Sequence, residues 1–200
     1  GTVFDSNAYE GRIEATHNTL AGFHGVFGTQ FESNDFSASG EEAFVPDFKT
    51  RAPAVFVFEE YALTRSLDLL IGGRYEFNQV NPVTYQTADF QPFSASTGLS
   101  WNIDGLKKYI AGITVAYTER APTGIELFAD GIHAARQIFE RGDSDLQTER
   151  STGVDLTFKK NDGVVTGGLN LFAQEYKDYI NLSPSGESVE GFDGYNYTPI

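Results

Sequence analysis

The sequence predicts an all-β fold: an antiparallel, up-and-down transmembrane β-barrel, of which the chain supplies an incomplete segment. Eight stretches alternate apolar and polar residues, so each expected strand has one apolar face. These stretches are longer than most strands of soluble proteins, and the links between them are short and long in turn. No apolar run approaches the roughly 18–20 residues of a membrane helix, which excludes a helical membrane protein.

The expected strands, in chain order, are residues 8–17, 21–32, 51–63, 67–77, 93–102, 109–118, 149–160 and 165–182. The first two are joined by a tight turn and carry an apolar residue or glycine at every second position. A link rich in serine, glycine and acidic residues follows. For the strand at 51–63, the sequence does not show which face is the apolar one. Phe56 and Phe58 lie on the same face as Glu60, whereas Val55 and Val57 lie on the same face as Tyr61. A β-bulge would resolve this conflict.

The later strands are more regular. The link at 78–92 carries Pro82 and Pro92, which resist central positions in a ladder. Asp104-Gly105 is a hairpin signal between the strands at 93–102 and 109–118. The longest link, 119–148, is expected to hold a short helix at 123–129. Asn161-Asp162-Gly163 turns the chain into the strand at 165–182, and a further strand is expected from Tyr195.

Three pairs of aromatic residues are each eight residues apart on one strand face: Phe23 and Phe31, Phe93 and Trp101, and Tyr109 and Tyr117. Eight tilted residues at ~3.3 Å each rise roughly 20 Å, near the ~25 Å apolar band between two aromatic girdles. The short turns would then face the periplasm and the long loops the outside. The alternative, a soluble β core, requires a covering layer that the sequence does not supply.

Composition narrows the class of protein. The net charge of −14 makes nucleic acid a poor partner, because phosphate binding needs a basic surface. The absence of cysteine excludes a disulfide scaffold and a thiolate metal site. No catalytic motif is found, so we expect no enzyme. The chain lacks an initiator methionine and stops inside an expected strand, which favours an internal piece of a longer polypeptide over a complete small protein.

The longest link carries a motif of specific spacing. It contains Arg120-Ala121-Pro122, then Glu126-Leu127, Gly131 and His133, and then Phe139, Glu140, Gly142, Asp143, Leu146, Glu149, Arg150 and Ser151. In this pattern the chain resembles the TonB-dependent receptors of Gram-negative outer membranes. Looser matches occur at residues 58–61, 72–76 and 175–180. The sequence Asp-Gly-Ile-His at 130–133 is most similar to the zinc and related metal-uptake branch.

The resemblance implies a barrel of about 22 strands. Residues 1–200 would be a partial barrel domain with about eight or nine of these strands, without the plug domain, the coupling box and the C-terminal strands. The implied partners are outer-membrane lipid, the TonB complex through the missing N-terminal region, and a small-molecule or metal substrate. The implied location is the cell outer membrane, and no resident cofactor is expected.

The function that the resemblance implies is active transport. Extracellular loops would bind a scarce nutrient, either a metal ion such as zinc or a chelate such as an iron complex, and TonB-supplied energy would import it. Two alternatives remain open: a passive porin or adhesin-like barrel, and a soluble β-sandwich binding module. A plug and coupling box upstream, or detergent dependence of the parent protein, would separate them.

The candidate metal ligands are Asp130, His133, Glu140 and Asp143, because imidazole and carboxylate groups suit Zn²⁺ and similar cations. The alternative is that Gly142-Asp143 shapes the loop and His133 is a packing residue. His17 and His24 flank the first turn and are close enough in sequence to meet across adjacent strands, although packing also explains them. The remaining loop acids are expected to form a solvated face: Glu41, Glu42, Asp47, Glu187 and Glu190.

Overall fold

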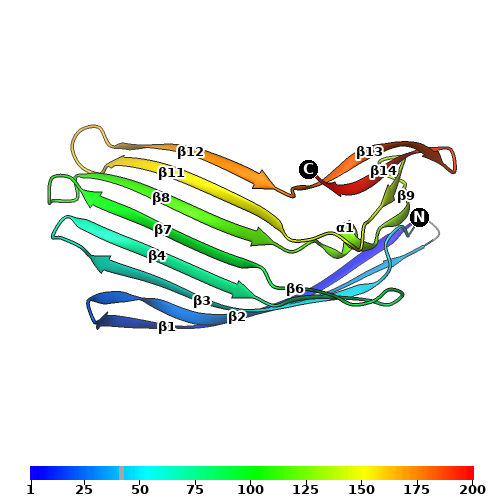
Figure 1. Cartoon of the computed structure of the whole chain (residues 1–200), viewed down its shortest axis with the longest axis horizontal. Helices are drawn as coiled ribbons and strands as arrows, with labels where there is room; N and C mark the ends of the chain where they lie inside the picture. Colours follow the sequence, from blue (N-terminus) through cyan, green and yellow to red (C-terminus); the bar gives the residue numbers. More distant parts are fainter. Residues whose placement is uncertain (41–42) are drawn as a thin grey trace.

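The structure, a computed structural model, describes residues 1–40 and 43–200. Within them, eight long antiparallel strands form one curved sheet, the wall of an incomplete barrel (Figure 1). In spatial order these are β1 (Val3–Leu20), β2 (Phe23–Ser39), β3 (Phe48–Ala62), β4 (Leu67–Glu76), β7 (Phe93–Asn102), β8 (Tyr109–Arg120), β11 (Glu149–Lys160) and β12 (Gly167–Lys177). Since each wall strand pairs with the previous and next one along the chain, the predicted up-and-down order is confirmed.

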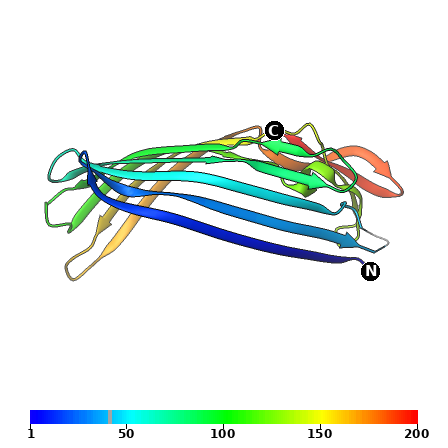
Figure 2. The same cartoon turned by 90° about the horizontal axis from the view of Figure 1, so that it is seen from below.

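The two ends of the wall differ, as the link lengths predict. The short turns that follow β1, β3, β7 and β11 lie together at one end (Figures 1 and 2). The other end carries the long links, with β5 (Asn78–Pro82), β6 (Ala88–Phe90) and α1 (Gly124–Phe128). The described residues include no helix long and apolar enough to cross a membrane.

Several boundaries differ from the prediction. β1 and β2 extend well beyond the expected strands, and their pairing continues to Val3 opposite Ser39. The apolar alternation ends earlier, because polar residues such as Asn34 and Asp35 keep the backbone ladder but face water beyond the apolar band. Similarly, the link expected at 78–92 contains the paired strands β5 and β6.

A second, four-stranded sheet lies at the loop end. Its order is β13 (Ile180–Val189), β14 (Phe192–Pro199), β10 (Ile138–Arg141) and β9 (Asp130–His133). The prediction of one strand over 165–182 is wrong, because Asp178 adopts a positive φ of 56° and turns the chain from β12 into β13. The strand expected from Tyr195 is β14, which pairs with β13 and β10 rather than with the wall.

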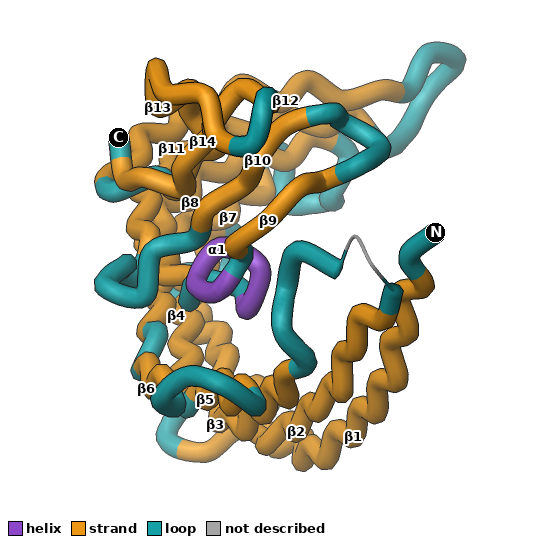
Figure 3. The backbone as a smooth tube through the Cα atoms, turned by 90° about the vertical axis from the view of Figure 1, so that its right-hand side faces the viewer, coloured by secondary structure: helices purple, strands orange, loops and turns teal. Residues whose placement is uncertain are grey.

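The strand register resolves the two faces of β3. β3 pairs with β2 and β4 without a bulge, so Val57 lies beside Phe27 on one face and Phe58 points to the other. Phe48, on the face of Phe58, packs against Gly124 of α1, and Figure 3 shows α1 on the concave side of the wall. The face of Val57 is therefore convex.

The convex face is apolar and exposed. Its exposed side chains include Ile13, Phe27, Phe31, Val55, Val57, Ile71, Phe93, Leu99, Trp101, Ile113, Val115, Val154, Leu156, Phe158, Leu169 and Leu171. For each wall strand with a predicted apolar face, that face lies on this side, and the register adds the faces of β3 and β12. Such a surface suits contact with hydrocarbon tails.

The buried core sits at the loop end rather than inside the wall. It comprises Phe44, Val45, Phe48, Val80, Leu127, Phe128, Ala129, Leu146 and Ile180. The predicted short helix is confirmed at its centre. A capping box begins it, because the Thr123 hydroxyl accepts a hydrogen bond from Glu126 N–H and the Glu126 carboxylate accepts one from Thr123 N–H.

Candidate functional site

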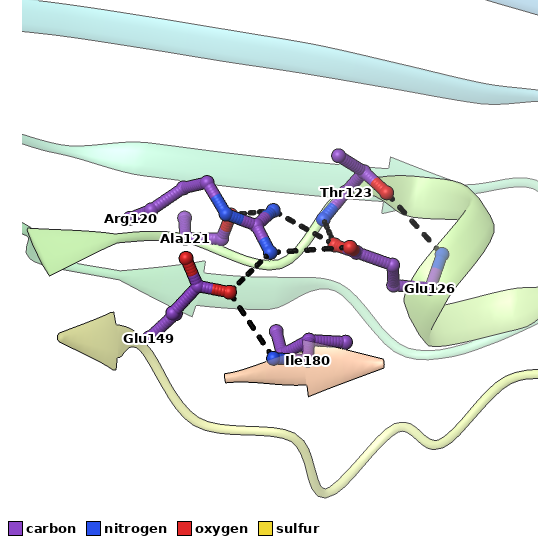
Figure 4. A network of polar contacts seen from close by, with 6 residues as sticks. All are labelled: Arg120, Ala121, Thr123, Glu126, Glu149 and Ile180. Atoms are coloured by element: carbon purple, nitrogen blue, oxygen red, sulfur yellow. Dashed lines mark hydrogen bonds and ion pairs between the residues drawn. The ribbon is translucent and has the colours of Figure 1, made fainter. Parts of the chain in front are cut away.

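The guanidinium group of Arg120 links the loop end of the wall to the loops (Figure 4). Arg120, the last residue of β8, donates from Nη1 to Glu126 Oε2 at 2.9 Å and from Nη2 to Glu126 Oε1 at 3.1 Å. Its Nη2 also donates to Glu149 Oε2 at 3.0 Å. This fork is geometrically specific, because only a planar guanidinium offers two parallel donors to one carboxylate.

Glu149 extends this junction to the second sheet. The side chain is nearly buried at the start of β11, and Oε2 accepts a hydrogen bond from the backbone N–H of Ile180 at 3.1 Å. Arg120 and Glu149 therefore connect β8, α1, β11 and β13. These motif residues thus tie the segments at the loop end to one another.

A second cluster surrounds the carboxylate of Glu140 in β10, which is 1% exposed. Oε1 lies 2.7 Å from His133 Nδ1 and accepts a hydrogen bond from Arg136 Nη1 at 3.1 Å. Oε2 accepts a hydrogen bond from the Tyr197 hydroxyl at 3.1 Å. Burial, together with the charge and hydrogen bond of Glu140, raises the pKa of Tyr197 to about 12, so the phenol stays protonated and donates to Glu140 even in mildly alkaline solution.

Within the described residues, one nitrogen of His133 is engaged and the other has no partner. Nδ1 faces Glu140, and the ring stacks on Phe44 with centroids 4.6 Å apart. Among the described residues, Nε2 has no hydrogen-bond partner, and it is not a buried atom. Since the carboxylate fixes Nδ1 and the orientation of the ring, Nε2 can serve as a ligand atom.

The structure brings together two of the four candidate metal ligands. Glu140 and His133 are in contact, but Asp130 and Asp143 have other partners. Asp130 Oδ1 lies 4.0 Å from Arg141 Nε, and Asp143 Oδ1 accepts a hydrogen bond from the N–H of Asp145 at 2.9 Å. In residues 1–40 and 43–200 no three His, Asp or Glu side chains are grouped so that they could hold a metal ion.

His17 and His24 do not meet. His17 Nε2 lies 2.8 Å from Glu59 Oε1 on the convex face, and His24 Nε2 lies 2.9 Å from Glu60 Oε2 on the concave face. The two histidines point to opposite faces because one has an odd and the other an even position in the ladder. Among the acids expected to form a solvated face, Glu41 and Glu42 lie outside the described residues.

Comparison with known proteins supports the architecture. The family model described as "TonB dependent receptor-like, beta-barrel" matches residues 2–200. The structure of the hemophore receptor HasR of Serratia marcescens, in complex with hemophore HasA and heme, aligns with 99% of this chain and 38% of its own, at 15% identity and a TM-score of 0.79.

Two further solved structures are similar. The copper transporter OprC aligns with 100% of this chain and 33% of its own, at 15% identity and a TM-score of 0.76. The siderophore receptor PirA of Pseudomonas aeruginosa aligns with 100% of this chain and 37% of its own, at 17% identity and a TM-score of 0.69. The chain therefore spans about a third of the length of these receptors.

Proposed function

The chain belongs to the TonB-dependent receptor β-barrel family, and on that premise we propose that the whole protein imports a metal complex across the outer membrane. The family consists of outer-membrane transporters and not of enzymes. In this proposal residues 1–200 are a partial barrel domain. The plug, the coupling box and the remaining strands belong to other parts of the polypeptide, through which the TonB complex supplies energy.

The observation that supports the choice of substrate is Nε2 of His133, which has no partner in residues 1–40 and 43–200. A bare Zn²⁺ ion takes three or four protein ligands in its usual sites. Glu140 cannot readily join His133 as such a ligand, because Arg136 and Tyr197 already occupy its two oxygens. A metal that arrives inside a chelate with an open coordination position, as in hemin, needs only one more ligand, which His133 Nε2 can supply.

The solved structures support this class of substrate. Their descriptions name a hemophore with heme, copper and a siderophore. Two of these three cargoes carry metal within a larger organic ligand. The proposal extends that property to this chain through His133 and leaves zinc, which the Asp-Gly-Ile-His pattern favours, as the competing substrate.

The test uses the full-length receptor with hemin, with a ferric bis-catecholate complex that leaves coordination positions open, and with Zn²⁺ alone. We expect the wild-type protein to bind one of the two complexes, and His133→Ala to weaken that binding at least tenfold. A histidine bound to hemin iron also shifts the Soret band, and this shift would disappear in the variant. His24→Ala, at the opposite end of the wall, is the matched control and should bind as the wild type does.

Two results would contradict the proposal. Equal binding of the complexes by the His133→Ala and His24→Ala proteins would remove His133 from the site. Tight binding of Zn²⁺ alone that is lost in His133→Ala would instead identify the bare ion as the substrate.

A further inference from the structure

The convex face carries a pocket of about 430 Å³ where the apolar band meets the loop end. Phe31, Pro53 and Phe77 form its apolar side, and Phe31 and Phe77 are 47% and 52% exposed. Pro53 pairs with Phe31 across β2 and β3, and its carbonyl accepts a hydrogen bond from the N–H of Phe77 at 2.9 Å. The backbone therefore holds these three residues side by side.

A cation borders this apolar floor on the side of the loops. Arg51 lies two residues before Pro53 in β3, so its side chain is on the same convex face. It pairs in register with Ser33 of β2 and Gln79 of β5. The side chain is exposed and lines the pocket.

The charge of Arg51 is not neutralised within the described residues. Asp89 lines the same pocket, but within the described residues it forms no ion pair with Arg51. Its Oδ1 instead accepts a hydrogen bond from Gln79 Nε2 at 2.8 Å. The next basic residue on this face, Lys49, differs because its Nζ lies 2.8 Å from Asp35 Oδ1. Arg51 is thus the cation on this part of β3 that remains available to an external anion.

We propose that this pocket binds the phosphorylated headgroup of an outer-leaflet glycolipid. A guanidinium recognises phosphate through paired N–H donors. Arg51 lies at the loop-side edge of an apolar floor on a lipid-facing wall, which is the level of a lipid headgroup phosphate. The acyl chains of that lipid would then lie over Phe31 and Phe77. Free phosphate would pair with Arg51 but make no contact with Phe31 and Phe77, whereas a lipid occupies both parts of the pocket, which favours the lipid as the occupant.

The test measures lipid binding to the full-length receptor in nonionic detergent by native mass spectrometry. The probes are bisphosphorylated lipid A, the same lipid without its phosphates, and inorganic phosphate. We expect Arg51→Gln to reduce the affinity for the phosphorylated lipid at least tenfold and to leave the affinity for the dephosphorylated lipid unchanged. Arg65→Gln, an exposed position in the turn between β3 and β4 at the opposite end, is the matched control.

A second variant and a salt titration separate the lipid from its competitors. Phe77→Ser should weaken binding of both lipids, because it removes the floor and not the cation. In the wild-type protein, added salt should weaken binding of the phosphorylated lipid alone. Equal affinity of the wild-type and Arg51→Gln proteins, salt-insensitive binding, or complete displacement of the lipid by millimolar inorganic phosphate would overturn the proposal.

Discussion

At the scale of single residues, Glu140 is a tightly held charge at the loop end, and it is the most deeply buried charged side chain of the described residues. It is buried, and three donors from β9, β14 and the turn between β9 and β10 share its two oxygens. Removal of one charge from such a network leaves its partners unpaired. In buried pairs this lowers the free energy of unfolding by about 3–5 kcal/mol.

We therefore expect Glu140→Ala to lower the local stability of the second sheet by an amount in that range. Amide hydrogen exchange of residues 130–141 and 192–199 in the full-length protein would measure it. Asp130→Ala is the control, because Asp130 is exposed and lies 4.0 Å from Arg141. Equal exchange rates in the two variants would show that the Glu140 network contributes little.

Tyr197 gives the same cluster a dependence on pH. The phenol has an ordinary pKa of 10.0, and burial with Glu140 raises the pKa to about 12 in the folded protein. Because the folded value is the higher one, the stabilisation is complete below about pH 10 and is lost as the pH rises through about 12. Phenolate absorbance of the wild type minus that of Tyr197→Phe should therefore titrate near pH 12, and a midpoint near 10 would contradict this.

The residues of this cluster differ in how far sequence could identify them. His133 and Glu140 stand seven residues apart in one motif, and the sequence predicts that they act together; the structure brings them into contact, and the metal role of His133 is a proposal. Tyr197 and Phe44 could not be predicted as their neighbours. Tyr197 is 57 residues from Glu140 and reaches it only because β14 lies parallel to β10.

At the scale of elements, the Arg120 fork fixes how four segments meet. Lysine at this position keeps the charge but offers no planar pair of donors to Glu126 and Glu149. We expect Arg120→Lys to weaken the junction by about 1.5–3 kcal/mol, the range for hydrogen bonds to charged groups. The readout is faster hydrogen exchange at the Ile180 amide, which donates to Glu149.

A matched substitution controls for the change of side chain. Arg150→Lys alters a looser pair, since Arg150 Nε lies 3.8 Å from Glu119 Oε1. Its effect on the Ile180 amide should be small. If both variants leave that amide equally protected, the fork does not hold β13 in place.

Strand positions were largely predictable, and strand ends were not. Alternation marks where side chains need an apolar medium, so it located all eight wall strands. It cannot mark where pairing stops, because hydrogen bonds between β1 and β2 continue through residues that face water. The break at Asp178 had only a weak signal, since aspartate tolerates a positive φ but neither glycine nor proline marks the turn.

At the scale of the whole molecule, the wall has two open edges within the described residues, β1 and β12. Unpaired edges expose rows of donors and acceptors that a membrane cannot satisfy. The curved sheet therefore requires further strands on both sides to lie in a bilayer, which agrees with its alignment to about a third of longer receptors.

The face assignment leads to a prediction for the assembled receptor in lipid. Ile113 lies on the convex face midway between Tyr109 and Tyr117, and its neighbour Thr114 points to the concave face. Arginine at the bilayer midplane costs about 2–4 kcal/mol on the lipid side of a barrel. We expect Ile113→Arg to lower the free energy of unfolding by that amount, measured by denaturant titration of the full-length protein in lipid vesicles.

Thr114→Arg adds the same side chain one residue further along the strand. It should cost much less, because a lumenal guanidinium stays in contact with water. The difference in free energy of unfolding between the two variants therefore reports which face of the wall contacts hydrocarbon. Equal costs would mean that the convex face is not in the membrane, and the lipid pocket proposed at Arg51 would then lose its physical basis as well.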